Sequence, residues 1–421
     1  MFRKKNTELF NQDYKAFCKQ HASKTEGQNY TLAKNLLLST NSREAKRNGH
    51  IFMLAGWTEA KKWLYANIVP CHSNYIIPDY DGEIYDDTHK FLESSGYNVH
   101  VLDMRASTKE YWDPVASLQK YGNTYTEAID TMSHILCRDV STDPFLRKAC
   151  EHILSMMLGY VKTLPAEQQT LRQVMDCVHK MQFDGNERKH WKFVTQCDDP
   201  LVIQRYQFLE NLPLQALKEA TVEISMAIHR YVPFDGQQRF DFQTLGSGKH
   251  ALFIRHMAQP DDMCKMSLLY TQLLENLYAF AESTPEHKCE RPVMVMLNQW
   301  IYNAPTKIIT ANKYNIHFFM PWHSMAELRH TYQEDWDCVQ GNCDTFIYMG
   351  HPGAGDREYV SKMLEQREHQ KGGMQLSTAL ALQNMQPEEC IVFVRGEAPF
   401  LAEKDYSNAH QLLWNNSFAK R

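Results

Sequence analysis

Residues His50–Ala66 read HIFMLAGWTEAKKWLYA, and this stretch decides the fold. The apolar run His50–Ala55 predicts a buried strand, and Thr58–Ala66 predicts a helix directly after it. The pattern then repeats with a strand at Asn74–Asp79, a helix at Glu83–Ser95 and a third strand at Asn98–Asp103. Apolar strands that alternate with helices indicate a mostly parallel sheet covered on both faces.

The middle of the chain differs, because Asp143–Arg230 has no strand signal and carries apolar residues at helical spacing. We interpret it as an all-helical insertion. Strands return at Lys249–Ile254, Arg291–Asn298, Ile316–Met320, Thr345–Met349 and Cys390–Val394, with a helix at Met263–Ala281. The predicted organisation is an irregular N-terminal segment (1–48, helical near Glu8–Gln20), an α/β domain in two parts (49–125 and 232–421), and the insertion (126–231).

Composition narrows the classes of function. A formal net charge of -5 excludes a uniformly basic nucleic-acid-binding surface, although a local patch such as Glu187–Lys192 stays open. No apolar run approaches the roughly 18 residues of a membrane helix, so we expect no direct membrane insertion. The 11 cysteines form no CxxC pair, which favours reduced thiols and a cytoplasmic location.

Several strings, in a fixed order, resemble the TraG-like type IV coupling proteins of conjugation. Ser73–Glu83 is similar to the family's S-Y-V-V-T-D-P-K-G-E, and Leu92–Asp103 to L-E-x-x-G-Y-K-V-x-V-L-D. Further matches are Trp112-Asp113-Pro114, Asp143-Pro144-Phe145, Leu268–Leu273, Gly341-Asn342-Cys343-Asp344-Thr345 and Arg395–Pro399. The resemblance covers about Leu32 to Pro399. It does not extend to the family's transmembrane N-terminus, so membrane anchoring is not among the properties that we expect here.

The resemblance implies a fold and a set of partners. The fold is α/β, a RecA-like P-loop NTPase fold with a mostly parallel sheet and an all-helical insertion domain. The family's members are hexameric ATPases that dock DNA–relaxase substrates on a secretion channel. Expected partners are therefore type IV secretion or conjugation components, including an active coupling ATPase, with DNA or relaxase contacting the all-helical domain. An oligomer, and recruitment to the inner membrane through partners, are left open.

The stretch that matches the phosphate loop has lost its key residues. A working loop reads G-x-x-x-x-G-K-[ST], with glycines that close around phosphates and a hydroxyl that holds Mg²⁺. Here the stretch is Ala55-Gly56-Trp57-Thr58-Glu59-Ala60-Lys61-Lys62, so both signature glycines are alanine and Lys62 replaces the hydroxyl. One interpretation is a phosphate site that persists without metal. The other is a strand-to-helix turn with solvated lysines.

The positions expected to activate water and sense phosphate are also altered. Asn298-Gln299 stands where the family ends a strand with Asp-Glu, and an amide is neither a general base nor a charged Mg²⁺ ligand. His323 stands at the family's sensor glutamine, where it could donate a hydrogen bond or simply lie at a helix start. The acidic stretch Asp79–Asp87 lacks EF-hand spacing, so we predict a turn and a helix N-terminus there, and no metal site.

These substitutions together predict a catalytically silent coupling protein that acts as an adaptor or structural subunit. Phosphoryl transfer depends on positioning and charge, and both are impaired at several independent positions. No cofactor is expected, with weak or metal-independent ATP binding left open. One alternative is a slow ATPase that uses Lys61, Lys62 and His323. Another is a nucleotide-independent DNA-binding module, whose affinity would fall steeply with salt.

Overall fold

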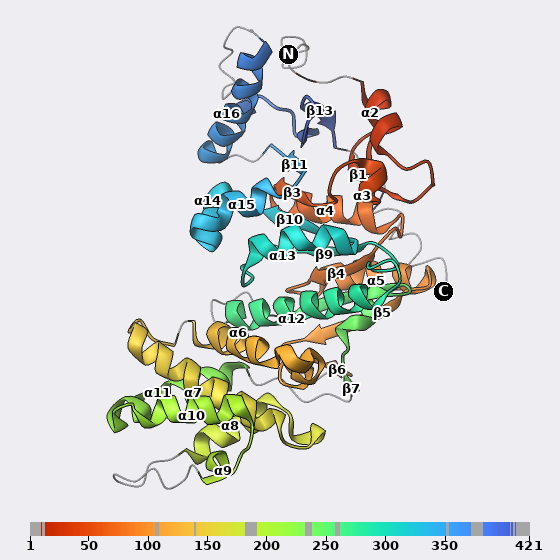
Figure 1. Ribbon diagram of the computed structural model, residues 1–421. Helices are drawn as coiled ribbons and strands as arrows, with labels where there is room; N and C mark the ends of the chain where they lie inside the picture. The colour runs from red at the N-terminus through yellow and green to blue at the C-terminus, as the bar shows by residue number, and fades with distance from the viewer. Residues whose placement is uncertain are drawn as a thin grey trace. The chain divides into compact units, whose positions relative to one another are not determined.

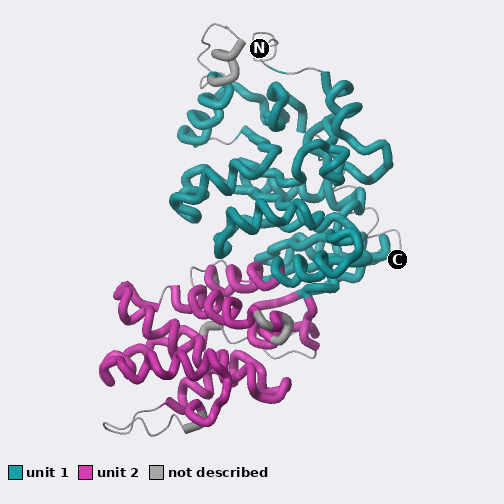
Figure 2. Tube along the Cα trace, viewed as in Figure 1, with its two compact units in different colours: residues 1–101, 242–255, 274–421 teal, residues 102–241, 256–273 magenta. Residues whose placement is uncertain are grey.

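The computed structural model describes residues 10, 13–105, 109–138, 140–181, 192–231, 238–256, 262–350, 353–371, 382–404, 406 and 409. The chain divides into two compact units, drawn in different colours in Figure 2. Unit 1 comprises residues 1–101, 242–255 and 274–421, and unit 2 comprises 102–241 and 256–273. The predicted insertion, 126–231, lies within the first range of unit 2.

Among the described residues, a nine-stranded sheet has the order β13-β12-β11-β3-β10-β9-β4-β8-β5. The strands are β3 (Ile51–Leu54), β4 (Asn74–Pro78), β5 (Asn98–Asp103), β8 (His250–Arg255), β9 (Val293–Met296), β10 (Ile316–Trp322), β11 (Thr345–Tyr348), β12 (Glu389–Val394) and β13 (Phe400–Glu403). The pairs from β11 through β3, β10, β9 and β4 to β8 are parallel, whereas β12 and β13 pair antiparallel at one edge. The sheet is therefore mostly parallel, as the alternating pattern predicts.

Helices cover this sheet in unit 1, as the ribbon in Figure 1 shows. They are α2 (Tyr14–His21), α3 (Ser42–Ala45), α4 (Trp57–Ile68), α5 (Glu83–Ser94), α13 (Ala304–Ala311), α14 (Met325–Tyr332), α15 (Trp336–Gly341) and α16 (Ala354–Lys371). Apart from the edge strand β5, the strands consist almost entirely of buried residues, most of them apolar. In one layer of this core, the Trp63 indole of α4 stacks on Phe319 of β10 with ring centroids 4.4 Å apart.

The N-terminal segment differs from its prediction as irregular chain. Residues Asn29–Ala33 (β1) and Leu36–Ser39 (β2) form an antiparallel hairpin, in which Asn35 adopts a positive φ of 60°. Asn tolerates the left-handed conformation better than most residues, so it suits a two-residue connection. The hairpin is tied to the end of the chain, because the Tyr406 hydroxyl donates to the Leu32 carbonyl at 2.8 Å.

Unit 2 consists mainly of helices. They are α6 (Tyr125–Cys137), α7 (Pro144–Lys162), α8 (Leu171–Lys180), α9 (Lys192–Thr195), α10 (Pro200–Glu210) and α11 (Leu214–Tyr231), while α12 (Asp262–Ser283) spans both units. Asp143 and Asp199 cap α7 and α10 with their carboxylates, and a proline follows each cap. In the described part of the chain, no helix is long and apolar enough to cross a bilayer.

Candidate functional site

The junction between β3 and α4 is only two residues long. β3 ends at Leu54 and α4 begins at Trp57, with Gly56 as an N-cap that has extended backbone (φ -67°, ψ 155°). The amides of Glu59 and Ala60 both donate to the Gly56 carbonyl at 3.1 Å, which is the bonding of a first helical turn. Most of the predicted loop, 57–62, is therefore helix. A phosphate loop, by contrast, surrounds phosphates with the backbone amides of a non-helical, glycine-rich turn.

The two lysines of this stretch are occupied by carboxylates. The Lys61 amino group forms an ion pair with Glu83 in the first turn of α5, and the Lys61 side chain is only 15% exposed. Lys62 pairs with Glu59 on its own helix, with 3.2 Å between Nζ and Oε1. An ATPase that relied on Lys61 would direct its amine toward an open, phosphate-sized cavity. In this structure the amine lies on Glu83 instead.

An aromatic pair connects α4 to the amides that follow β9. Trp57, which is 37% exposed, meets the ring of Tyr80 edge-on at a centroid separation of 6.5 Å. The Tyr80 hydroxyl donates to Asn298 Oδ1 at 3.3 Å, and burial raises the pKa of this phenol. Asn298 thus accepts a hydrogen bond at a position where a metal-binding site would need a carboxylate. The structure brings Trp57 and Asn298 together through Tyr80, a residue that the sequence analysis did not single out.

The neighbouring residue Gln299 is held by its backbone. The Tyr332 hydroxyl donates to the Gln299 carbonyl at 2.6 Å, and the Tyr332 ring meets Trp322 edge-on at 5.8 Å. These contacts fix the turn after β9 against α14. Because the contact to Gln299 involves only its backbone carbonyl, it does not depend on whether the side chain is an amide or an acid.

His323 lies at the start of α14. Its backbone amide donates to Glu327 Oε2 at 3.0 Å, while Ser324 Oγ accepts from the Glu327 amide at 3.1 Å. This reciprocal arrangement is a variant of the capping box, and it orders the chain between β10 and α14. The exposed side chain of His323 also lines the cavity described next.

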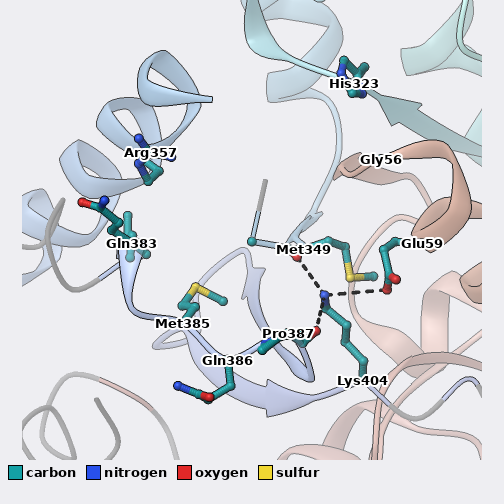
Figure 3. A pocket seen from close by; sticks show the side chains of 12 residues that line it. Gly56, Glu59, His323, Met349, Arg357, Gln383, Met385, Gln386, Pro387 and Lys404 are labelled. Carbon is teal, nitrogen blue, oxygen red and sulfur yellow. Dashed lines mark hydrogen bonds and ion pairs between the residues drawn. The ribbon is translucent and has the colours of Figure 1, made fainter. Parts of the chain in front are cut away.

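A cavity of about 690 Å³ opens at the carboxyl ends of β3, β10 and β11 (Figure 3). Its lining contains Gly56, Glu59 and His323 from the predicted site, but neither Lys61 nor Asn298. The sequence analysis missed the rest of its wall, which is Met349, Gly350, Arg357, Leu382, Gln383, Met385, Gln386, Pro387 and Lys404. A signal existed for Met349 and Gly350, because they lie at the carboxyl end of the predicted strand Thr345–Met349, where ligands bind in open α/β sheets.

The acidic stretch after β4 acts as a helix cap. Asp79 accepts hydrogen bonds from the amides of Ile84 and Tyr85 at 3.1 and 2.8 Å, and Asp81 accepts from Glu83 N at 3.1 Å. Among the described residues, no three His, Cys, Asp or Glu side chains gather as a metal site would require. The basic stretch 187–191 lies outside the described residues.

Comparison with solved structures defines the class of fold. The plasmid coupling protein TrwB in complex with ADP and Mg²⁺ matches with a TM-score of 0.64 at 11% identity, covering 94% of this chain and 93% of that one. TrwB with the non-hydrolysable ATP analogue ADPNP gives 0.65 at the same identity and coverage. VirB4 of Thermoanaerobacter pseudethanolicus gives 0.53 at 12% identity, covering 91% and 97%. The chain has the RecA-like P-loop fold that the resemblance implies.

Family models identify the group within that fold. A model described as "Type IV secretory system Conjugative DNA transfer" matches residues 13–212, and one described as "TraM recognition site of TraD and TraG" matches residues 297–384. No curated protein is similar enough to this chain to count as a match. The chain belongs to the type IV coupling proteins of conjugative DNA transfer, which confirms the resemblance drawn from the sequence.

Proposed function

We propose that this coupling protein neither binds nor hydrolyses ATP productively, and that it acts as an adaptor or structural subunit of a conjugation machine. The observation that carries the proposal is the start of α4 only two residues after β3, which makes most of the residues that match the phosphate loop helical. Without a phosphate-binding loop, the side-chain amide of Asn298 and the ion-paired Lys61 would have no phosphate or metal ion to contact.

The charge pattern around the junction supports the same proposal. Glu59 and Glu83 place two carboxylates beside Lys62 and Lys61, so the positive charge that would attract a nucleotide is balanced within the chain. Polyphosphate binding at a helix N-terminus needs free amides and uncompensated cations. This site offers neither a loop of amides nor an unpaired Lys61.

The partners follow from the family. We infer that the chain assembles with other components of a type IV secretion or conjugation machine, such as an active coupling ATPase or a TraM-like recognition partner. The second family model, at residues 297–384, supports a surface for such a partner in unit 1. The retained scaffold then serves assembly, while a different subunit supplies the work of ATP hydrolysis.

Calorimetric titration with a non-hydrolysable ATP analogue, with and without Mg²⁺, tests the silent site, together with steady-state hydrolysis. We expect no heat of binding at micromolar ligand concentration and no turnover, in the wild type or in Lys61→Ala. Turnover that Lys61→Ala abolishes would refute the proposal and favour the slow-ATPase alternative. Lys313→Ala, which removes an exposed lysine elsewhere in unit 1, is the matched control for surface charge.

A further inference from the structure

One wall of the cavity is held together by the side chain of Lys404. Its amino group donates to the carbonyls of Met349 and Pro387, both at 2.8 Å, and lies 3.6 Å from Glu59 Oε2. Figure 3 shows these three contacts converging on the nitrogen. Two of the three donors of the ammonium group are thus used in hydrogen bonds, the charge is paired with Glu59, and the side chain is only 11% exposed.

The three contacts come from parts of unit 1 that are distant in sequence. Met349 follows β11, Pro387 precedes β12, and Glu59 lies in the first turn of α4. The backbone of Lys404 adds a fourth link, because its amide donates to the Glu388 carbonyl at 2.7 Å. A single residue therefore joins the helix, the turn and the loop that form this side of the cavity.

Glu59 completes the arrangement from the opposite side. A carboxylate in the first turn stabilises a helix through the dipole, so α4 carries an anion of its own at the end that opens onto the cavity. Glu59 also pairs with Lys62, which fixes its position. The chain thus supplies both the anion for the helix end and the cation that balances it.

We propose that Lys404 is an internal tether that holds the cavity walls in one arrangement through its own contacts. A site that opens and closes needs two arrangements of similar free energy, and contacts made in only one of them shift the balance to that one. Moving the loop at Pro387 would leave a partly buried ammonium without its partners, which is unfavourable. The tether rests on the proposed silent site and explains how its walls stay ordered without nucleotide.

Native-state hydrogen exchange of the full chain tests the tether in Lys404→Met, which keeps an unbranched side chain one atom shorter and removes its donors. Three hydrogen-bonded amides in the loop and at the start of β12 serve as reporters: Met385 to Leu382 O, Gln386 to Glu389 Oε2, and Glu389 to Gln386 O. Loss of two hydrogen bonds and an ion pair is expected to speed their exchange about tenfold or more, while amides of β9 keep their rates. Unchanged exchange at the three reporters would overturn the proposal.

Two further variants sharpen the result. Lys34→Met removes an exposed ion pair to Glu403, the residue before Lys404, without touching the cavity, and should leave the reporters unchanged. Glu59→Gln keeps both carbonyl contacts of Lys404 and should speed the reporters less than Lys404→Met does. If Lys404→Met does not fold, Glu59→Gln carries the test, and unchanged exchange in it overturns the tether.

The proposed function and the tether fail in different ways. Exchange in the wild type is also measured with the ATP analogue and Mg²⁺. Protection by the analogue would contradict the silent site. Unchanged hydrogen exchange at the three reporter amides in Lys404→Met, together with no effect of the analogue on the wild type, would contradict only the tether.

Discussion

Gly396 shows how a single residue of the family's strings serves the fold. It adopts a φ of +84°, and a Cβ at this position would lie 2.9 Å from the guanidinium of Arg47. That guanidinium donates to the Arg395 carbonyl at 2.6 Å and lies 3.5 Å from Glu397. Glu397 also faces the buried His21 at 3.3 Å. The string Arg395–Pro399 therefore fastens the N-terminal segment to the turn between β12 and β13.

The variant Gly396→Ala is expected to lower the free energy of unfolding by about 1–2 kcal/mol, because it forces an L side chain into left-handed backbone. Displacement of Arg47 adds to that cost. Urea denaturation measures the change. Gly355→Ala, in α16 with nothing within 4 Å of the added Cβ, is the control and should be neutral or slightly stabilising. Equal midpoints for the two variants would contradict the strain at Gly396.

At the scale of elements, three buried histidines gather at the amino ends of the central strands. His50 precedes β3, His72 precedes β4, and His317 lies in β10. The His50 ring accepts the amide of Phe318 at 3.0 Å, and His317 Nδ1 is 2.8 Å from the Tyr30 hydroxyl. Burial lowers the pKa of His50 to about 4 and that of His72 and His317 to about 3. All three are therefore neutral in the folded protein at ordinary pH.

This cluster predicts a loss of stability in mild acid. The unfolded histidines have a pKa near 6.5, so between about pH 4 and 6.5 the unfolded chain binds more protons than the folded one. The free energy of unfolding then falls as the pH is lowered through this window, by up to about 1.4 kcal/mol per pH unit for each histidine. Above pH 6.5 their contribution is constant. Urea titrations between pH 8 and 5 measure the slope.

His72→Gln should flatten that slope, because it removes one of the three titrating groups. His72 suits this substitution, since its ring makes a local contact to Ser73 Oγ at 2.7 Å. His330→Gln on the surface of α14 is the matched control. A slope that stays the same in His72→Gln would show that other groups dominate the acid response.

The same elements show what a sequence pattern can and cannot predict. The run at Ile316–Met320 was predictable because an apolar strand of a buried sheet stands out from its flanks, and the run at Asn98–Asp103 because Val99, Val101 and Leu102 mark a short strand among polar residues. The β1–β2 hairpin was missed because two strands of five and four residues give too little periodicity. At the site, the substitutions at 55–62 and 298–299 were visible in the sequence. The contacts of Lys404 could not be predicted, because they depend on carbonyl groups that only the folded chain brings together.

At the scale of the whole molecule, the charge balance bears on nucleic acid. With a formal net charge of -5, the chain lacks the excess of cations that drives non-specific binding to DNA. Many of its lysines and arginines are moreover paired with carboxylates, as Arg205 is with Asp130 at 2.7 Å in unit 2. We therefore expect contact with protein partners to dominate.

Fluorescence anisotropy with a labelled 30-base-pair duplex measures this expectation. No saturable binding is expected at 150 mM salt and micromolar protein. An affinity that is measurable at 50 mM salt and falls by about 10³ or more at 200 mM would instead favour the DNA-binding alternative. A duplex of unrelated sequence serves as the control for base specificity.

The short link between β3 and α4 also limits the ways in which this lineage could change. Point substitutions could return the acids, the hydroxyl or the glycines one at a time, but none of them by itself unwinds the first turn of α4. A phosphate-binding turn would also require residues 57–60 to leave the first turn of α4, whose amides at Glu59 and Ala60 already donate to the Gly56 carbonyl. The proposed loss of motor activity would therefore be harder to reverse than any single substitution suggests.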